Sequence, residues 1–194
     1  MNDSDTKRSR LAGGGSINGV TFKTLQMNKD ERGCFTEVFQ EYWGTCLQPV
    51  QWSVVHSRKG VLRGPHLHKN HDEYIGVISG MISVGLRDMR PGSPTEGVWS
   101  LYELVDVEMA CLVFPSGLLH GWYFPVETIH LQGVSESHRD YGESDNLGCK
   151  WDDPELDIPW PTAAPIISER AMSFPSYREL VESLQGWTPE PVRD

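Results

Sequence analysis

The sequence contains no apolar stretch of the roughly 18 consecutive residues that a membrane-spanning helix needs. Its first residues, MNDSDTKRSRLAGGGS, include no hydrophobic segment and do not resemble a secretory signal. From these two absences we expect a cytoplasmic protein without membrane contact. We also expect residues 1–17 to form a disordered tail.

Positive charge is scarce relative to negative charge. The chain has 17 lysines and arginines against 27 aspartates and glutamates, which gives a net charge of −10 at pH 7. A surface with this balance repels nucleic acid and anionic membranes. An anionic small molecule could still bind, but it would need arginines placed at its own site.

Cysteine is also sparse, and its positions exclude the common cysteine motifs. The four cysteines are widely spaced, and no pair has zinc-ribbon or redox spacing. We therefore favour free thiols over a disulfide framework. The residues concerned are Cys34, Cys46, Cys111 and Cys149.

What the sequence does contain is a series of short segments rich in β-branched and aromatic residues. Glycine, proline, serine or aspartate bounds each one, a pattern typical of a sandwich or barrel. Near the end, SYRELVESLQ has helical spacing, with Ser176 as N-cap and Glu179 three residues on. We predict one all-β barrel domain, residues 18–190, with a short C-terminal helix. The predicted strands are GVTFKTLQM, CFTEVFQ, QWSVVHS, EYIGVISG, MISVGLRD, VWSLYELV, ACLVFPSG, GWYFPV and IHLQGVSES.

The stretch GPHLHKNHDEYIGVISG gathers three histidines and an acid. His66 and His68 lie two apart, so on a strand they face the same side; His71 and Glu73 follow. A later segment, PSGLLHG, adds His120 after a turn. The three imidazoles of His66, His68 and His120, with the Glu73 carboxylate, suit a divalent Mn, Fe, Co, Ni or Zn ion. Any one such histidine, taken alone, is more often a hydrogen-bonded core or surface residue.

The spacing of these residues resembles the two cupin motifs. The run from Gly60 to Gly80 matches the first motif at every position, and Pro115 to His120 matches most of the second. The second motif's leading glycine and trailing asparagine are replaced by Met109 and Phe124. The resemblance implies a double-stranded β-helix, also called a jelly-roll barrel. In metal-binding cupins the matching positions hold the ion, which implies a metal set of His66, His68, Glu73 and His120.

A longer resemblance covers residues of about 18–185. The segments DERGCFTEVFQ, QWSVVHSRKGVLRGPHLH, GLRDMRPGSPTEGVW and KWDDPELDIPWP are similar, in order, to those of dTDP-4-dehydrorhamnose 3,5-epimerases. That family implies an isomerase of a nucleotide-linked 4-keto-6-deoxysugar in deoxysugar or polysaccharide biosynthesis. It also implies a homodimer in which N-terminal strands extend the partner's sheet. It requires no cofactor.

The resemblance assigns roles position by position. His66 matches the catalytic base, and we expect catalysis to rest on His66 and His120. Three expected helpers are absent: Glu73 stands at the lysine position, Gln132 at the tyrosine acid and Ala171 at the aspartate partner of the base. His130 could stand in for the acid. The expected substrate-binding residues are Arg32, Glu37, Gln51, Arg63, Gln132 and His138.

These losses keep other functions open besides the isomerase. One is a metal-dependent cupin enzyme, of dioxygenase or lyase type, acting on a small molecule. Another is a non-catalytic sugar-nucleotide-binding protein. His66 cannot serve as metal ligand and as free base through the same nitrogen, so the metal and isomerase hypotheses compete for this residue.

Overall fold

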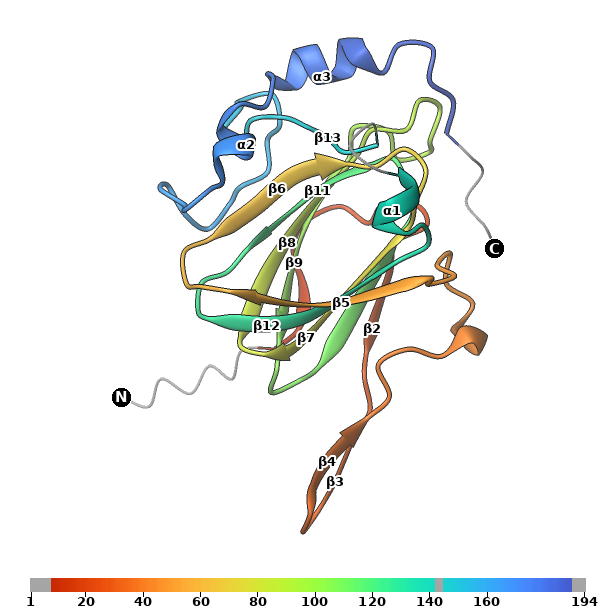
Figure 1. Ribbon diagram of the computed structural model, residues 1–194, viewed down its shortest axis with the longest axis vertical. Helices are drawn as coiled ribbons and strands as arrows, with labels where there is room; N and C mark the ends of the chain where they lie inside the picture. Colours follow the sequence, from red (N-terminus) through yellow and green to blue (C-terminus); the bar gives the residue numbers. More distant parts are fainter. Residues whose placement is uncertain (1–7, 142–144, 190–194) are drawn as a thin grey trace.

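The computed structural model describes residues 8–141 and 145–189, and its frame is two antiparallel β-sheets (Figure 1). The larger sheet has six strands, and the smaller has five. In spatial order the larger sheet contains β1 (Arg10–Gly14), β9 (Trp99–Val105), β8 (Met81–Asp88), β11 (Leu118–Tyr123), β6 (Leu62–Leu67) and β13 (Leu147–Gly148). The smaller contains β2 (Thr21–Thr24), β10 (Ala110–Phe114), β7 (Glu73–Ser79), β12 (Thr128–Val134) and β5 (Gln51–Ser57).

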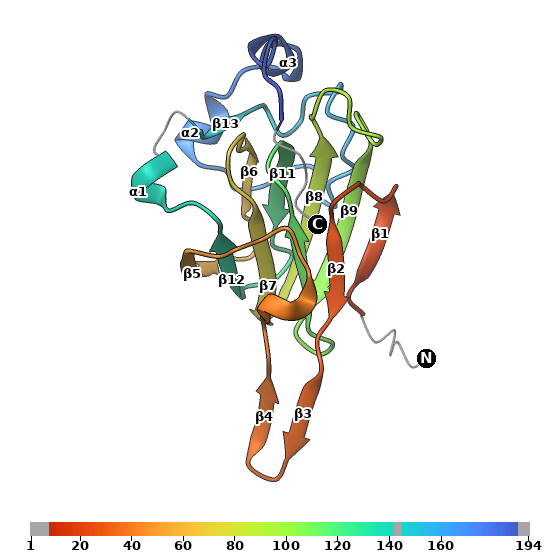
Figure 2. The ribbon, with the colours of Figure 1, turned by 90° about the vertical axis from the view of Figure 1, so that its right-hand side faces the viewer.

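The main core lies between the inner faces of the two sheets, which face each other in Figure 2. Alternate residues of each strand point into it, as the period of two in a strand requires. Ile75 and Val77 of β7 and Leu118 and Trp122 of β11 belong to this core. The expected all-β, cupin-like barrel is therefore confirmed, and polar side chains that replace these apolar ones along the same faces lie inside the barrel.

A glycine sets how closely β6 approaches β11. Gly64 has a φ of +89°, and a Cβ there would lie 2.8 Å from the carbonyl oxygen of His120. Only glycine combines this backbone conformation with that approach. Two residues later, His66 pairs directly with His120 across the two strands.

Among the described residues, three short α-helices come after β12, and α3 confirms the predicted C-terminal helix. They are α1 (His138–Tyr141), α2 (Glu169–Met172) and α3 (Tyr177–Ser183). The hydroxyl of Ser176 accepts from the Glu179 backbone N–H, and the Glu179 side chain accepts from the Ser176 backbone, forming the expected capping box. Leu180 and Leu184 pack in a second cluster, on the outer face of the larger sheet. No helix among the described residues is long and apolar enough to cross a membrane.

A two-stranded hairpin, β3 (Met27–Asp30) and β4 (Gly33–Thr36), extends away from the barrel, and the 3-10 helix η1 (Glu41–Trp43) follows it (Figures 1 and 2). The predicted strand CFTEVFQ therefore ends early, at Thr36. The four cysteines, all within the described residues, form no disulfide, as expected.

The expected tail of residues 1–17 needs a correction. Residues 1–7 lie outside the described part of the chain, but β1 pairs with β9, and Ile17 is buried in the main core. Backbone hydrogen bonds to β9 hold this glycine-rich segment in place at the edge of the sheet. Such bonds do not require alternating apolar side chains, so the sequence shows no pattern that predicts the strand. The predicted domain of residues 18–190 thus starts too late, and its last residue lies outside the described part.

Candidate active site

The polar residues of the barrel interior come from four neighbouring strands and the loop between two of them. β6 contributes His66, and His68 follows directly after its end; β11 contributes His120. Glu73 begins β7, and Gln132 lies on β12. His68, Glu73 and His120 are buried, whereas His66 is partly exposed. The prediction that His66 and His68 face the same side is confirmed, and His120 joins them: the three ring centroids lie 5.3–6.4 Å apart.

Glu73 is the centre of this group. Its Oε1 atom lies 3.3 Å from His68 Nε2, 3.3 Å from His120 Nε2 and 3.6 Å from His71 Nε2. Its second oxygen, Oε2, accepts a hydrogen bond of 3.2 Å from the Gln132 amide. One buried carboxylate oxygen therefore faces three imidazole nitrogens.

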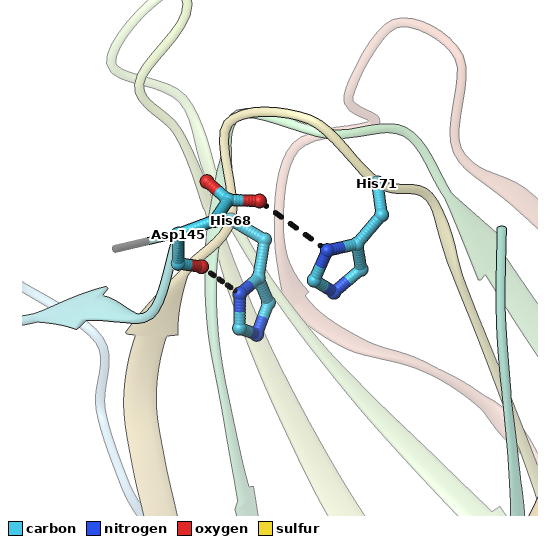
Figure 3. A group of neighbouring side chains, drawn as sticks. All are labelled: His68, His71 and Asp145. Atoms are coloured by element: carbon cyan, nitrogen blue, oxygen red, sulfur yellow. Dashed lines mark hydrogen bonds and ion pairs between the residues drawn. The ribbon is translucent and has the colours of Figure 1, made fainter. Parts of the chain in front are cut away.

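The Nδ1 atoms of His120, His68 and His71 point away from Glu73 and contact other groups, which we call outer partners. His120 Nδ1 donates to the carbonyl oxygen of Leu118 at 2.9 Å. His68 Nδ1 donates to the carbonyl oxygen of Asp145, and His71 Nδ1 lies 3.3 Å from the Asp145 carboxylate (Figure 3). Asp145 also accepts from the backbone N–H groups of Lys69 and Asn70, which fixes the loop that carries these histidines. Such outer partners orient imidazole rings and set their tautomers.

Burial and neighbouring charges shift the pKa values of the group in opposite directions. Burial, with His120 and His68 nearby, lowers the pKa of His66 to about 3. Burial likewise lowers the pKa of His68 to about 4, against the opposing charge of Glu73. Burial also disfavours the charged form of His71, but hydrogen bonds with Asp145 and Glu73 raise its pKa to about 9. Burial opposes ionisation of Glu73, yet the surrounding histidines hold its pKa well below the ordinary value.

His66 stands apart from the cluster around Glu73. It lies outside both groups of potential ligand atoms, which are His68 with Glu73 and His120, and His68 with His71 and Asp145. Its ring packs edge-on against Phe174, with centroids 5.6 Å apart. A neutral, partly exposed imidazole on the interior face is in the state that a general base requires.

A profile described as dTDP-4-dehydrorhamnose 3,5-epimerase matches residues 15–179. The chain belongs to the dTDP-4-dehydrorhamnose 3,5-epimerase family. A dTDP-4-dehydrorhamnose 3-epimerase from Streptomyces niveus is 31% identical over 162 residues, which cover 79% of this chain and 77% of that protein.

Solved structures of epimerases share the fold. One is a 4-keto-6-deoxy sugar epimerase from the novobiocin biosynthetic gene cluster of Streptomyces spheroides, with a TM-score of 0.80, 28% identity and 94% coverage of each chain. Another is a dTDP-4-dehydrorhamnose 3,5-epimerase from Bacillus anthracis with TDP and PPi bound, with a TM-score of 0.76, 31% identity and coverage of 87% of this chain and 99% of that one. Epimerases are isomerases, so the expected enzyme class is confirmed. These relatives give no support to a dioxygenase or lyase.

Within this epimerase-family chain, several predicted substrate-binding residues border the barrel interior. Arg63, on β6, donates to the Ser57 hydroxyl on β5 at 2.9 Å and keeps an exposed guanidinium. Gln51, on β5, accepts from the His138 backbone N–H at 3.0 Å, which connects β5 to α1. Gln132 bonds to Glu73, as described above.

Two other predicted substrate-binding residues lie elsewhere. Arg32 is at the turn of the β3–β4 hairpin, where its guanidinium pairs with Asp30 at 2.5 Å and its side chain is 85% exposed. Glu37 follows the same hairpin and is exposed. The hairpin extends away from the barrel, so one chain does not bring these two residues to His66.

The sequence hypothesis missed two members of the cluster. His71 was visible in the histidine-rich stretch, but no motif assigned it a position. Asp145 is far from that stretch in sequence, and only its contacts with His68 and His71 in the folded chain reveal it (Figure 3). The ring of Tyr141, in α1, stacks on His71 with centroids 4.3 Å apart and covers this side of the group.

Proposed function

We propose that this protein epimerises a nucleotide-linked 4-keto-6-deoxysugar, with His66 as the general base. The observation that carries the proposal is the placement of His66. In a chain that matches the epimerase family almost throughout, it is partly exposed on the barrel interior, directly opposite His120. A dTDP-linked sugar is the proposed substrate, in line with the names of the relatives and the TDP held by the Bacillus anthracis neighbour.

The reaction uses the acidity that a ketone gives to its neighbouring carbons. His66 takes the proton from C3 or C5 as that C–H bond breaks, and the electron pair moves into the enolate of the C4 ketone. A proton then returns to the same carbon from the opposite face, which inverts it. A positioned base of this kind contributes about 10²–10⁴-fold to the rate.

The site departs from the family pattern where the enolate forms. Glu73 replaces the expected lysine, and its negative charge would oppose an enolate unless neighbouring cationic groups compensate it. Gln132 replaces the expected tyrosine and bonds to Glu73, so it cannot return the proton. His130, which faces the interior two residues before Gln132, remains the candidate proton donor from β12.

We further propose that the protein acts as a homodimer. The outer face of the smaller sheet exposes Trp52 and Val54 on its edge strand β5, together with Ile78 and Ile129 on the neighbouring strands. An edge strand with exposed apolar side chains is a ready pairing site for another chain. A partner's β3–β4 hairpin against β5 would also give a role to the exposed Arg32.

Deuterium exchange tests the proposed reaction. Incubation with a dTDP-4-keto-6-deoxyglucose in D₂O should place deuterium at C3, C5 or both, and His66→Asn should reduce the exchange rate by about 10²–10⁴-fold. His56→Asn is the matched control, because His56 lies on β5 with its ring on the exposed side, paired with Glu127. No exchange by the unaltered protein, or equal exchange by His66→Asn, would overturn the proposal.

A further inference from the structure

The cluster around Glu73 contains buried atoms whose electrostatic requirements are not met by protein groups. Among the residues that the structure describes, neither Glu73 Oε1 nor His120 Nε2 has a hydrogen-bond partner, although the two atoms are 3.3 Å apart. His68 Nε2 lies at the same distance from Glu73 Oε1. Buried polar atoms are almost always satisfied, so this exception requires an explanation.

The hydrogen bonds of His120 Nδ1 and His68 Nδ1 show which ring nitrogens carry protons. A carbonyl oxygen can only accept, so His120 Nδ1 carries the proton that it donates to Leu118, and His68 Nδ1 carries the one that it donates to Asp145. In a neutral imidazole the other nitrogen, Nε2, is then a bare lone pair. Two bare nitrogens therefore face one carboxylate oxygen. His71 Nε2, 3.6 Å from that oxygen, can offset part of its charge, but it does not reach the lone pairs of His68 and His120, which still require a cation among the three atoms.

A proton can bridge only one of these pairs, whereas a metal ion satisfies all three atoms at once. One oxygen and two imidazole nitrogens, all within 4.8 Å of one another, form a set that divalent transition metals bind. The hydrogen bonds from Nδ1 of His68 and His120 to backbone carbonyl oxygens turn the Nε2 atoms toward Glu73. Metal-binding histidines are oriented by hydrogen bonds of this kind.

A second group, His68 with His71 and Asp145, is a weaker candidate. The carboxylate oxygens of Asp145 already accept the backbone N–H groups of Lys69 and Asn70 at 2.6 and 3.2 Å. Its place is that of an outer partner, which positions the loop and His71 (Figure 3). Glu73 Oε1, in contrast, accepts no hydrogen bond from the backbone.

We propose that His68, Glu73 and His120 form a binding site for one divalent transition-metal ion of the zinc, iron, cobalt, nickel or manganese class. His66 lies outside this set, so the base and the metal ligands are different residues. Such an ion would supply Lewis acidity beside the reacting ketone. Binding itself does not depend on the proposed epimerase activity, and the test below measures binding alone.

Calorimetry on full-length, chelator-treated protein, titrated with Zn²⁺ and separately with Co²⁺, tests the site. We expect one ion per chain, a higher melting temperature with metal and a cobalt absorption spectrum in the visible range. Glu73→Gln and His120→Gln should each weaken binding by more than about 100-fold, beyond the 10–100-fold effect typical of an outer partner. His56→Gln should bind metal as the unaltered protein does, because His56 is an exposed histidine, paired with Glu127, outside both ligand groups.

Two further observations keep the test decisive if a ligand variant fails to fold. X-ray absorption at the metal edge of the unaltered protein should show nitrogen and oxygen neighbours at about 2.0–2.2 Å, including imidazole. Failure of the unaltered protein to bind either ion at neutral pH would overturn the proposal and leave a network held by protons. Binding that survives in both ligand variants would also overturn it, since the ion would then be held elsewhere.

Discussion

At the scale of single residues, Arg63 is a cation placed to meet an anionic substrate in an otherwise acidic chain. Its Nε atom donates to Ser57 at 2.9 Å, and one Nη2 hydrogen is directed at the His56 carbonyl oxygen at 3.4 Å. These contacts hold the Arg63 side chain between β5 and β6, and the remaining N–H groups of its guanidinium can donate to a diphosphate. The planar fork of arginine suits phosphate oxygens, and Arg63 lies three positions before the proposed base, His66.

Replacement of Arg63 should therefore weaken nucleotide binding without unfolding the protein. A lost charge-assisted bond is worth about 1.5–3 kcal/mol, so we expect the Kd for dTDP to rise by about 10–100-fold in Arg63→Ala. Arg58→Ala is the control, because Arg58 lies exposed in the turn after β5. Calorimetric titration with dTDP measures both, and an unchanged Kd in Arg63→Ala would contradict the assignment.

The residues of the site were predictable where a motif carried them and not elsewhere. His66, His68, Glu73 and His120 stand at spacings that a barrel must bring together, and they do face one interior. That His66 lies outside the ligand groups could not be read from spacing, because the i, i+2 rule fixes a face and not a distance. No sequence motif around Asp145 predicts its role, because that role depends on His68 and His71, which lie more than 70 positions earlier in the chain.

At the scale of elements, the close approach of β6 and β11 determines where His66 and His120 face each other. Gly64 permits that approach, because any side chain there would meet the His120 carbonyl oxygen. The backbone at this position is also left-handed, which disfavours every other residue. One glycine thus connects the local conformation of β6 with the geometry of the site.

Two alanine variants separate these effects. Gly92→Ala places a side chain at a φ of +78° with no atom within 4 Å, so it should cost only about 1–2 kcal/mol of unfolding free energy. Gly64→Ala adds the clash at 2.8 Å, and we expect a further cost of about 1–3 kcal/mol. Urea unfolding measures both values. Equal costs would mean that β6 can move away from β11 without penalty.

Elements whose boundaries are set by neighbouring residues in the sequence were predicted well. Strands that form only because a distant strand pairs with them were not. The capping box of Ser176 and Glu179 identifies the start of α3 from residues within one turn. β6 was absent from the predicted strands because its Gly-Pro pair interrupts the β pattern, and β1 because its glycines carry no hydrophobic period. Both strands form because a neighbouring strand supplies the hydrogen bonds.

At the scale of the whole molecule, one chain leaves two features without a function. The β3–β4 hairpin projects from the barrel with Arg32 at its turn, and the outer face of the smaller sheet exposes apolar side chains along β5 (Figures 1 and 2). The family resemblance predicted substrate contacts for Arg32, which the single chain does not provide. In the proposed homodimer, pairing of the hairpin of one copy with β5 of the other would account for both features.

A charge placed on this face should separate the proposed dimer. Val54 is 69% exposed on the edge strand β5, and Val54→Lys would put an ammonium into an apolar interface, where an unpaired charge is costly. Val107→Lys is the matched control, since Val107 is 61% exposed in the turn between β9 and β10. Sedimentation should show dimers for the unaltered protein and Val107→Lys, and monomers or a dissociation constant raised at least about tenfold for Val54→Lys. In the proposed homodimer Arg32 meets the nucleotide bound by the other copy, so Val54→Lys should also weaken dTDP binding. A monomeric unaltered protein that binds dTDP fully would contradict this role of the hairpin.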